Sequence, residues 1–410
     1  MALAAFKGWS PTAKHTVTAS FLAWSMDAYC FFLLVFVFKD IAAQFGTSIK
    51  QVAFAVTLTL AFRPLGAFVF GRLADRFGRR PILMLDVALY SLLNCAIAFT
   101  TNIETFYVAC AAFGIAMGGV WGIGASLSME TIPNNARGFV SGLLQSGYPT
   151  GYLVASLVYG FLYPIIGWQN MFMVGVAPAF VLVFYIYFKV PESRHFDPGR
   201  ARSKEASTLN ILRNHGKLAL FAIILMTGYN FFSHGTQDLY PTFLQVQHHF
   251  DPPTVKNIAV IYNIGAIIGG LFFGSVSQSF GRRRTAMLVT VLALPVIYFW
   301  AYAATAVALA LGAFLMQICV QGAWGVVPAY LNELAPADAR GTFAGTCYQL
   351  GNFIASINAV LQAGIAERMG GNYSIALAGV ATFAALLICT MMKFGPEKHN
   401  VAMGREPVGE

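Results

Sequence analysis

Residues 71–80 read GRLADRFGRR, and residues 274–283 read GSVSQSFGRR. The same offset of 203 positions (274 minus 71) places Trp121-Gly122 on Trp324-Gly325, and it places ETIPNNARGFVSG at 130–142 on ELAPADARGTFAG at 333–345. An alignment of so many uncommon residues without a gap predicts two homologous halves. Such halves pack around a pseudo-two-fold axis, with a binding site between them near the midplane.

The composition indicates where these halves fold. Of the 410 residues, 10% are charged and 57% are apolar, whereas soluble domains have about 25% charged residues. These values exclude a soluble enzyme, a disordered protein and a secreted disulfide scaffold, and they predict an integral, multi-pass membrane protein. A helix needs about 20 apolar residues to cross a bilayer. Twelve apolar stretches are long enough, at 17–42, 51–72, 81–101, 105–129, 138–163, 168–189, 216–246, 255–277, 284–304, 306–331, 341–365 and 372–394.

A charged segment at 190–215 divides these stretches into two sets of six. We therefore expect an all-α fold of twelve transmembrane helices in two pseudo-symmetric six-helix bundles, 1–189 and 216–394, with a linker at 190–215 and a tail at 395–410. Basic residues are enriched in loops that face the cytoplasm. Both termini, the linker and the tail are then cytoplasmic, since most of the 26 basic residues lie inside. The exceptions are Lys39, Lys50, Lys256 and Arg368 outside, and Arg63 within a helix. The net charge of +9 is thus a topology signal, and we expect no nucleic-acid partner.

The stretch Gly71–Arg80 resembles the loop motif between helices 2 and 3 of the major facilitator superfamily, and the second copy has Gln278 in place of Asp75. The resemblance covers nearly the whole chain and implies transport by alternating access. We expect a monomer in a prokaryotic inner membrane. The resemblance also implies gating latches at the cytoplasmic helix ends, formed by Asp75, Arg79, Glu130, Arg137, Arg282, Glu333 and Arg340.

Inserting a charged side chain deep in a membrane costs about 2.5–3.5 kcal/mol on insertion scales, so each such residue is expected to have a function or a partner. Away from helix ends the sequence has Asp27, Arg63, His234 and Asp238. A second group lies nearer the helix ends and is expected to reach the interface, namely Lys39, Asp40, Asp86, Glu130 and Glu333.

The segment 230–242 carries a polar stripe. At 100° per residue, Asn230, His234 and Asp238 fall within an arc of about 80°, and Gln237 joins them. Such a stripe must face a cavity or another helix rather than lipid. His234 and Asp238 are one turn apart, so they can titrate as a coupled pair that handles protons or substrate. The alternative is a hydrogen-bond cluster that only packs helices.

The same segment resembles the signature N-x-x-S-H-x-[ST]-Q-D-x-x-x-T of the Jen-type monocarboxylate–proton symporters. Every specified position is present, at Asn230, Ser233, His234, Thr236, Gln237, Asp238 and Thr242. The resemblance implies recognition and proton-coupled symport of small carboxylates such as lactate and pyruvate. These permeases belong to the wider sialate–proton symporter group, so sialate and other organic acids remain possible substrates.

Asp27 lies at the position that the offset of 203 pairs with Asn230 (230 minus 27), so both are expected at one central cavity. Asp27 is interpreted as a proton carrier, or else as a fixed partner of Arg63. Because Arg63 stays protonated, it needs an anion. That anion is either Asp27 at all times or a substrate carboxylate, which a guanidinium binds bidentately. A misplaced helix boundary would remove Arg63 from the membrane.

Other residues are expected on the inner faces of the remaining helices, as ligand contacts or as packing. They are Gln145, Tyr148, Tyr152, Gln321, Trp324, Tyr348 and Asn352. A glycine face formed by Gly114, Gly118, Gly119, Gly122 and Gly124 predicts close helix packing.

The sequence contains no Walker A loop, hydrolase nucleophile elbow or metal-ligand spacing. We therefore expect no enzyme, cofactor or metal, and transport driven by a gradient. The partners are a small carboxylate, protons and membrane lipid. Proton-coupled symport is the main hypothesis, and exchange of organic anions on the same fold is the alternative.

Overall fold

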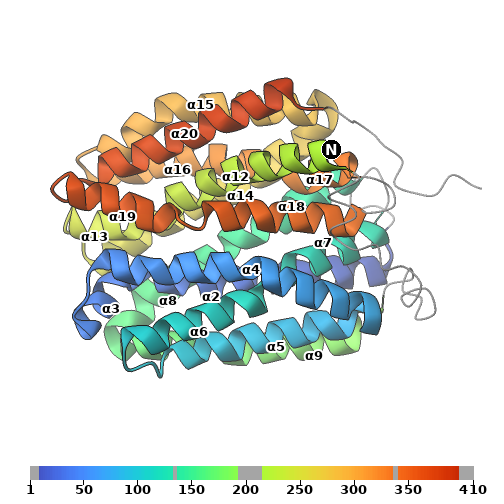
Figure 1. The fold of residues 1–410 in the computed structure, drawn as a ribbon, viewed down its shortest axis with the longest axis horizontal. Helices are drawn as coiled ribbons and strands as arrows, with labels where there is room; N and C mark the ends of the chain where they lie inside the picture. Colours follow the sequence, from blue (N-terminus) through green and yellow to red (C-terminus); the bar gives the residue numbers. More distant parts are fainter. Residues whose placement is uncertain (1–8, 133–135, 193–214, 336–339, 397–410) are drawn as a thin grey trace, which may run out of the picture.

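The structure is a computed structural model, and it describes residues 9–132, 136–192, 215–335 and 340–396. The described chain is built of helices that run nearly antiparallel along one axis (Figure 1). The first half contains α2 (Pro11–Phe36), α3 (Phe38–Phe45), α4 (Ile49–Phe77), α5 (Arg79–Ile97), α6 (Ile103–Met117), α7 (Val120–Thr131), α8 (Arg137–Val174) and α9 (Val176–Lys189).

The second half repeats this order. It contains α12 (Gly216–Gln237), α13 (Tyr240–Val246), α14 (Pro252–Phe280), α15 (Arg282–Tyr302), α16 (Ala306–Trp324), α17 (Val327–Leu334), α18 (Arg340–Ala355), α19 (Asn358–Arg368) and α20 (Tyr373–Phe394). The predicted linker and tail lie mostly outside the described residues, since 193–214 and 397–410 are not among them.

Ten helical segments of the described chain are long and apolar enough to cross a membrane. One of them, Gly138–Lys189, contains two crossings because Gly167 has non-helical dihedral angles (φ 73°, ψ 173°) that reverse the chain. A further crossing is formed by α18 followed by α19. The fold is therefore the predicted one, with twelve transmembrane helices in two bundles of six.

The repeated motif has the same backbone in both halves. Gly78 and Gly281 each end one helix and begin the next, with φ of 100° and 99°. This left-handed region favours glycine, because a side chain there is strained. The shared geometry explains why FGRR recurs at 77–80 and 280–283.

Several crossings are broken near their middle, which the apolar runs did not predict. The chain breaks at Val37 between α2 and α3, and at Gly118-Gly119 between α6 and α7. Breaks also occur between α12 and α13 and between α16 and α17. In transport folds such discontinuous helices occur beside the central site.

The two halves meet along two pairs of helices, α8 with α14 and α4 with α18 and α19. Glycines bring α8 and α14 together: a Cβ on Gly142 would lie 2.8 Å from the carbonyl oxygen of Gly270. Within the first half, a Cβ on Gly114 would lie 2.1 Å from the carbonyl oxygen of Thr59. The prediction of close packing is confirmed for Gly114 and also for Gly118, which faces the backbone of Arg63.

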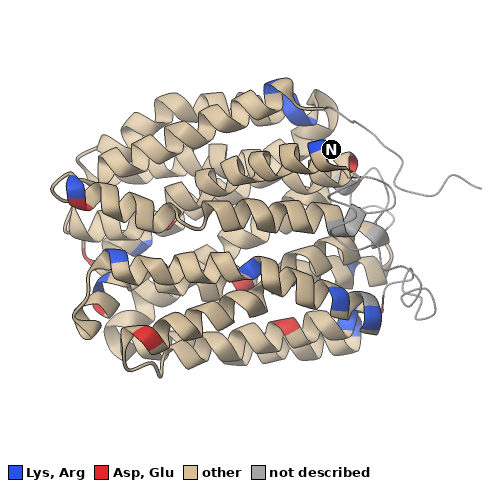
Figure 2. Ribbon diagram, in the orientation of Figure 1, with Lys and Arg blue, Asp and Glu red and all other residues tan. Residues whose placement is uncertain are grey.

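Charged residues gather at the two ends of the bundle and are sparse between them (Figure 2). We call the end at which α2 begins and α20 ends the terminal end, and the other the opposite end. The outer face between them exposes large apolar side chains such as Phe272, Val291 and Phe383. An apolar belt of this kind is what lipid contact requires.

Candidate functional site

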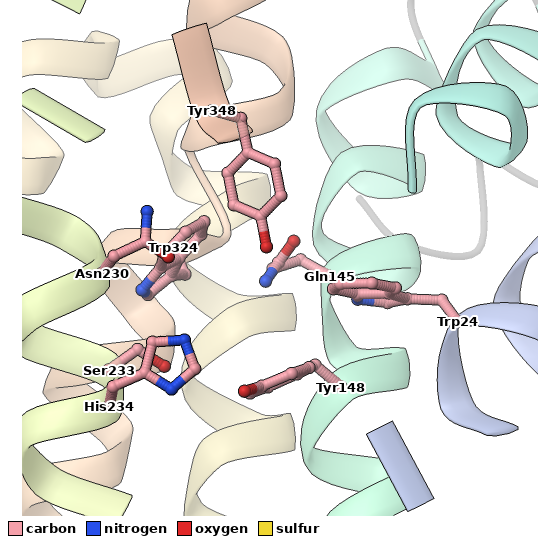
Figure 3. Close-up of a pocket in the computed structure, with 8 residues that line it drawn as sticks. All are labelled: Trp24, Gln145, Tyr148, Asn230, Ser233, His234, Trp324 and Tyr348. Carbon is pink, nitrogen blue, oxygen red and sulfur yellow. The ribbon is translucent and has the colours of Figure 1, made fainter. Parts of the chain in front are cut away.

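A cavity lies between the two halves at the middle of the bundle (Figure 3). Its empty volume is about 210 Å³. The first half contributes Trp24 from α2 with Gln145 and Tyr148 from α8, and the second contributes Asn230, Ser233, His234, Trp324 and Tyr348. The cavity is therefore formed jointly by the two duplicated bundles, as the repeat predicts.

Aromatic rings form most of the wall. Trp24 stacks on Tyr148, with ring centroids 5.5 Å apart. Tyr348 meets the edge of Trp324 at 5.9 Å, and it stacks on Trp121 of the other half at 4.7 Å. The Trp324 indole donates to the carbonyl oxygen of Tyr229 at 3.1 Å. These contacts fix flat apolar surfaces that bracket a small ligand.

The polar stripe of α12 supplies one side of the cavity. His234 Nδ1 lies 3.1 and 3.2 Å from the two carboxylate oxygens of Asp238. Asp238 is fully buried and does not line the cavity, so the imidazole lies between its carboxylate and the cavity. The side-chain nitrogen of Asn230 donates to the carbonyl oxygen of Met226 at 2.8 Å. The ring of His234 points into the cavity with Nε2 free of the Asp238 contact (Figure 3).

Asp27 and Arg63 form a buried pair behind the wall. Arg63 Nη2 lies 3.6 Å from Asp27 Oδ2. This distance allows an ion pair but is too long for a good hydrogen bond. Neither carboxylate oxygen of Asp27 has a hydrogen-bond partner among the described residues. The guanidinium packs over Phe31 at 5.3 Å, and its Nη2 lies 3.3 Å from Met117 Sδ. Arg63, for which a substrate contact was predicted, does not line the cavity in this conformation.

Two residues predicted to contact substrate pack helices instead. Gln237 is the last residue of α12, and its amide donates to Gln317 of α16 at 2.7 Å. Asn352 interacts with Gln349 at 3.4 Å, and Gln349 donates to the carbonyl oxygen of Gly118. Neither lines the cavity. Gln237 faces α16, and a helical wheel of α12 alone does not show which helix is its neighbour.

The comparisons with known proteins agree with this architecture. A family model described as the Major Facilitator Superfamily matches residues 19–252 and 239–407. The chain belongs to the major facilitator superfamily. It is an integral, multi-pass membrane protein.

Several relatives of this superfamily member are named for organic acids. A carboxylic acid transporter protein homolog of Saccharomyces cerevisiae is 29% identical over 375 residues, which are 85% of this chain and 60% of that protein. The sialic acid transporter NanX of Escherichia coli is 25% identical over 95% of this chain and 96% of its own length. A cis,cis-muconate transport protein of Acinetobacter baylyi is 29% identical over 93% of both chains.

Solved structures of the superfamily share the fold. The xylose transporter XylE from Escherichia coli, in a partially occluded inward-open conformation, superposes with a TM-score of 0.75 over 95% of this chain and 99% of that chain. The human organic anion transporter MFSD10 gives a TM-score of 0.69 over 92% of this chain. Identities of 17% and 15% make these likenesses of fold alone.

In the second half, two of the residues predicted to form a latch make an ion pair. Arg282 is buried and makes a double contact with Glu333, at 2.9 and 3.2 Å, and it also donates to Ser277 and Gln278. In the first half the backbone amide of Arg79 donates to Glu192 at 2.8 Å. The side chains of Asp75, Glu130, Arg137 and Arg340 lie outside the described residues.

Two expectations about helix ends are wrong. Glu333 does not reach the interface, because it is buried against Arg282. Asp86 is also fully buried, although it is close in sequence to the start of α5. The cause is the packing of neighbouring helices around the first turns of α5, which sequence position does not reveal.

Trp24 and Ser233 line the cavity but were not among the predicted contacts. Both had a signal in the sequence. Trp24 lies one helical turn before Asp27, and Ser233 belongs to the segment that matches the symporter signature. Among the described residues, no group of three or more His, Cys, Asp or Glu side chains is placed to hold a metal ion.

Proposed function

We propose that this chain is a secondary active transporter that couples the movement of small organic anions, such as lactate and pyruvate, to protons by alternating access. The observation that carries the proposal is the closed cavity shared by the two halves, with His234 in its wall and Asp238 behind it. The names of the relatives support an organic-acid substrate.

The lining of the cavity favours a short acid. Flat rings on two sides and few polar groups suit an anion with one carboxylate and a short carbon chain. The similarity to a sialic acid transporter keeps larger sugar acids as the alternative substrate.

In the proposed binding mode, His234, Asn230, Gln145, Tyr148 and Tyr348 contact the anion. A protonated His234 donates to the carboxylate, since charge-assisted hydrogen bonds are the stronger ones. Asp238 orients the imidazole from behind the wall of the cavity and shares a proton with it across the contact of 3.1 Å. Substrate and proton together leave the cavity nearly neutral, which removes the cost of moving a buried charge.

Asp27 and Arg63 are proposed to couple this binding to the protons. A proton on Asp27 neutralises the partner of Arg63 and frees the guanidinium to attract the carboxylate past Tyr348. When Asp27 is ionised, Arg63 returns to it at the separation of 3.6 Å. Substrate and proton then bind together, which is the condition for symport.

The remaining assignments complete the proposal. The bundles 1–189 and 216–394, joined by the linker 190–215, rock against each other while the tail 395–410 stays in the cytoplasm. Both termini are cytoplasmic, the membrane is a prokaryotic inner membrane, and the functional unit is a monomer in lipid.

Uptake of labelled lactate into vesicles that contain the purified protein tests the proposal. We expect uptake to rise with an inward proton gradient and to collapse when an ionophore removes the gradient. Uptake that does not depend on the proton gradient, together with counterflow at constant pH, would establish an anion exchanger instead. Thermal shifts with C2–C4 acids and with sialate then rank the substrates, because a ligand that binds the native state raises its stability.

A further inference from the structure

Trp24 on α2 borders two cavities. It lines the central cavity of Figure 3, and it also lines a second cavity. Among the described residues, the two cavities have no other lining residue in common. The side chain of Trp24 is buried, so it is a shared wall between two internal spaces. The other residues that line the second cavity are Ser20, Val120, Trp121, Gly124, Ala125, Leu144 and Pro328.

Trp121 completes this shared wall. It lines the second cavity, and its ring stacks at 4.7 Å on Tyr348, which lines the central cavity. Its indole nitrogen lies 3.5 Å from the amide oxygen of Gln145, which also lines the central cavity. Trp24 in turn stacks on Tyr148 at 5.5 Å. Two indoles, which we call the partition, thus separate the cavities, and each is held by a ring of the central one.

The second cavity lies on the terminal side of the central cavity. Ser20 is one helical turn before Trp24 on α2, which begins at the terminal end. Pro328 lies in the first turn of α17. The amide of the next residue, Ala329, donates to Ser141 of the other half at 3.2 Å. The second cavity is therefore enclosed between the partition and a contact that joins the two halves.

The lining of the second cavity is mostly apolar. Its residues other than Ser20 are aliphatic, aromatic or glycine. The hydroxyl of Ser20 and the indole nitrogen of Trp24 are buried without a hydrogen-bond partner among the described residues. Packing alone would favour a side chain at position 24 without an unpaired donor. This lining suits a carbon chain, and it does not suit an ionised carboxylate, which would be buried without partners.

The proposed binding mode directs the carbon chain of the anion toward Trp24. His234 holds the carboxylate in that mode, and Figure 3 shows Trp24 on the side of the cavity away from His234. A longer chain on the same carboxylate would therefore meet the indole. Without the indole, the chain could continue into the second cavity.

We propose that Trp24 is a specificity-determining residue, whose indole closes the central cavity and limits the substrate to a short carbon chain. The inference rests on the proposed binding of a monocarboxylate at His234. Replacement of Trp24 by alanine joins the two cavities. The joined cavity accepts an unbranched monocarboxylate of about six carbons, with its carboxylate at His234 and its chain beside Val120 and Leu144.

Thermal-shift titrations of the purified full-length protein with lactate, hexanoate and adipate test the proposal, since they give apparent dissociation constants. We expect wild type to bind lactate more tightly than hexanoate. In Trp24→Ala the affinity for hexanoate relative to lactate should rise by about tenfold to a hundredfold, because each buried methylene contributes about fourfold. Adipate has the same chain length but should not gain, because its second carboxylate would be buried without partners.

Two further variants test whether such a gain comes from the partition. Trp168→Ala removes a buried tryptophan that lines neither cavity and donates to Gln44 at 2.9 Å. The relative affinity for hexanoate should be unchanged in this control. Ser20→Val, added to Trp24→Ala, places two methyl groups in the second cavity. This double variant should lose the gain for hexanoate and still bind lactate.

Lactate binding by Trp24→Ala without a gain for hexanoate would overturn the proposal. A wild type that already prefers hexanoate would also overturn it, as would an equal gain in Trp168→Ala. Where Trp24→Ala does not fold, Trp24→Leu retains part of the partition and should show a smaller gain of the same sign; the absence of any gain there would contradict the proposal. If wild type binds none of the acids, the proposed function itself fails and this inference with it, which is distinct from lactate binding without a length preference.

Discussion

At the scale of single residues, the chemistry of the cavity depends on few side chains. Asn230, His234 and Asp238 were predicted from a helical wheel to share one face. The first two lie on α12, and Asp238 is the residue that caps its C-terminus. Gln237 shares the wheel face but contacts α16. The wheel gives the direction of a side chain, whereas the end of the helix and the partner across the interface come only from the three-dimensional packing.

Substitution of His234 tests the proposed binding mode most directly. We expect His234→Gln to raise the KM for lactate by about tenfold to a hundredfold, because a hydrogen bond to a charged group contributes about 1.5–3 kcal/mol. The measurement is initial uptake rate against lactate concentration in vesicles. His15→Gln is the matched control, since His15 bonds Tyr185 at 2.8 Å away from the cavity. An unchanged KM in His234→Gln would remove this residue from the binding site.

The buried pair of Asp27 and Arg63 makes a prediction about stability. We expect Arg63→Met to lower the free energy of unfolding by about 3–5 kcal/mol, because it leaves the Asp27 charge buried and unpaired. The double variant Arg63→Met with Asp27→Asn should regain most of that loss. Denaturant unfolding in detergent measures both variants, and equal losses in the single and double variants would show that the two side chains do not interact.

At the scale of helices, the breaks at Val37 and Gly118-Gly119 were not predicted, although the crossings themselves were. A hydrophobic run continues through a break, because only the backbone dihedral angles of one or two residues change. The predicted close packing is confirmed at Gly114 and Gly118, since close contact between helices needs small residues. It is wrong at Gly122, where a Cβ would meet nothing within 4 Å.

The crossing of α8 with α14 leads to a prediction at this scale. A Cβ on Gly142 would lie 2.8 Å from the carbonyl oxygen of Gly270, so Gly142→Val forces the two helices apart. We expect the variant to fold and to transport at least about tenfold more slowly. Destabilising the closed state by about 1.4 kcal/mol lowers its population about tenfold.

Gly345 is the matched control for Gly142, since the offset of 203 aligns the two and a Cβ on Gly345 meets nothing within 4 Å. Uptake by Gly345→Val should stay near the wild-type rate. Equal effects of the two substitutions would indicate that valine disturbs either helix in itself rather than the contact between the halves.

At the scale of the whole molecule, both ends of the cavity are closed. At the terminal end, Ser141 donates to the carbonyl oxygen of Gly325 and accepts from the amide of Ala329, each at 3.2 Å. Toward the opposite end, Tyr152 of α8 meets Tyr262 of α14 edge to face, with ring centroids 5.4 Å apart. Sequence repeats predicted two halves, but they did not predict this state, since any conformation of the cycle has the same sequence.

Gln245 allows a test of the closure at the opposite end. Its amide bridges the halves by donating to the carbonyl oxygen of Phe36 at 3.1 Å and to the hydroxyl of Tyr159 at 3.0 Å. We expect Gln245→Ala to increase hydrogen exchange of the backbone around Phe36, because each bond contributes about 0.5–1.5 kcal/mol. Mass spectrometry of exchanged peptides measures the effect.

Gln247→Ala is the control for this measurement, because Gln247 bonds Ser374 and Tyr373 within its own half. Exchange around Phe36 should be unchanged in the control. Protection of this segment that survives in Gln245→Ala would show that other contacts between the halves, such as Tyr152 with Tyr262, keep the opposite end closed.

The stacking of Tyr348 on Trp121 has a consequence for how affinity is measured. One half supplies the tyrosine and the other supplies the surface on which it rests, so the recognition surface is whole only while the bundles are together. The observed dissociation constant then equals the intrinsic one divided by the fraction of molecules in that arrangement. Substitutions far from the ligand will therefore alter apparent binding strength, and a detergent or lipid that shifts the population will do the same.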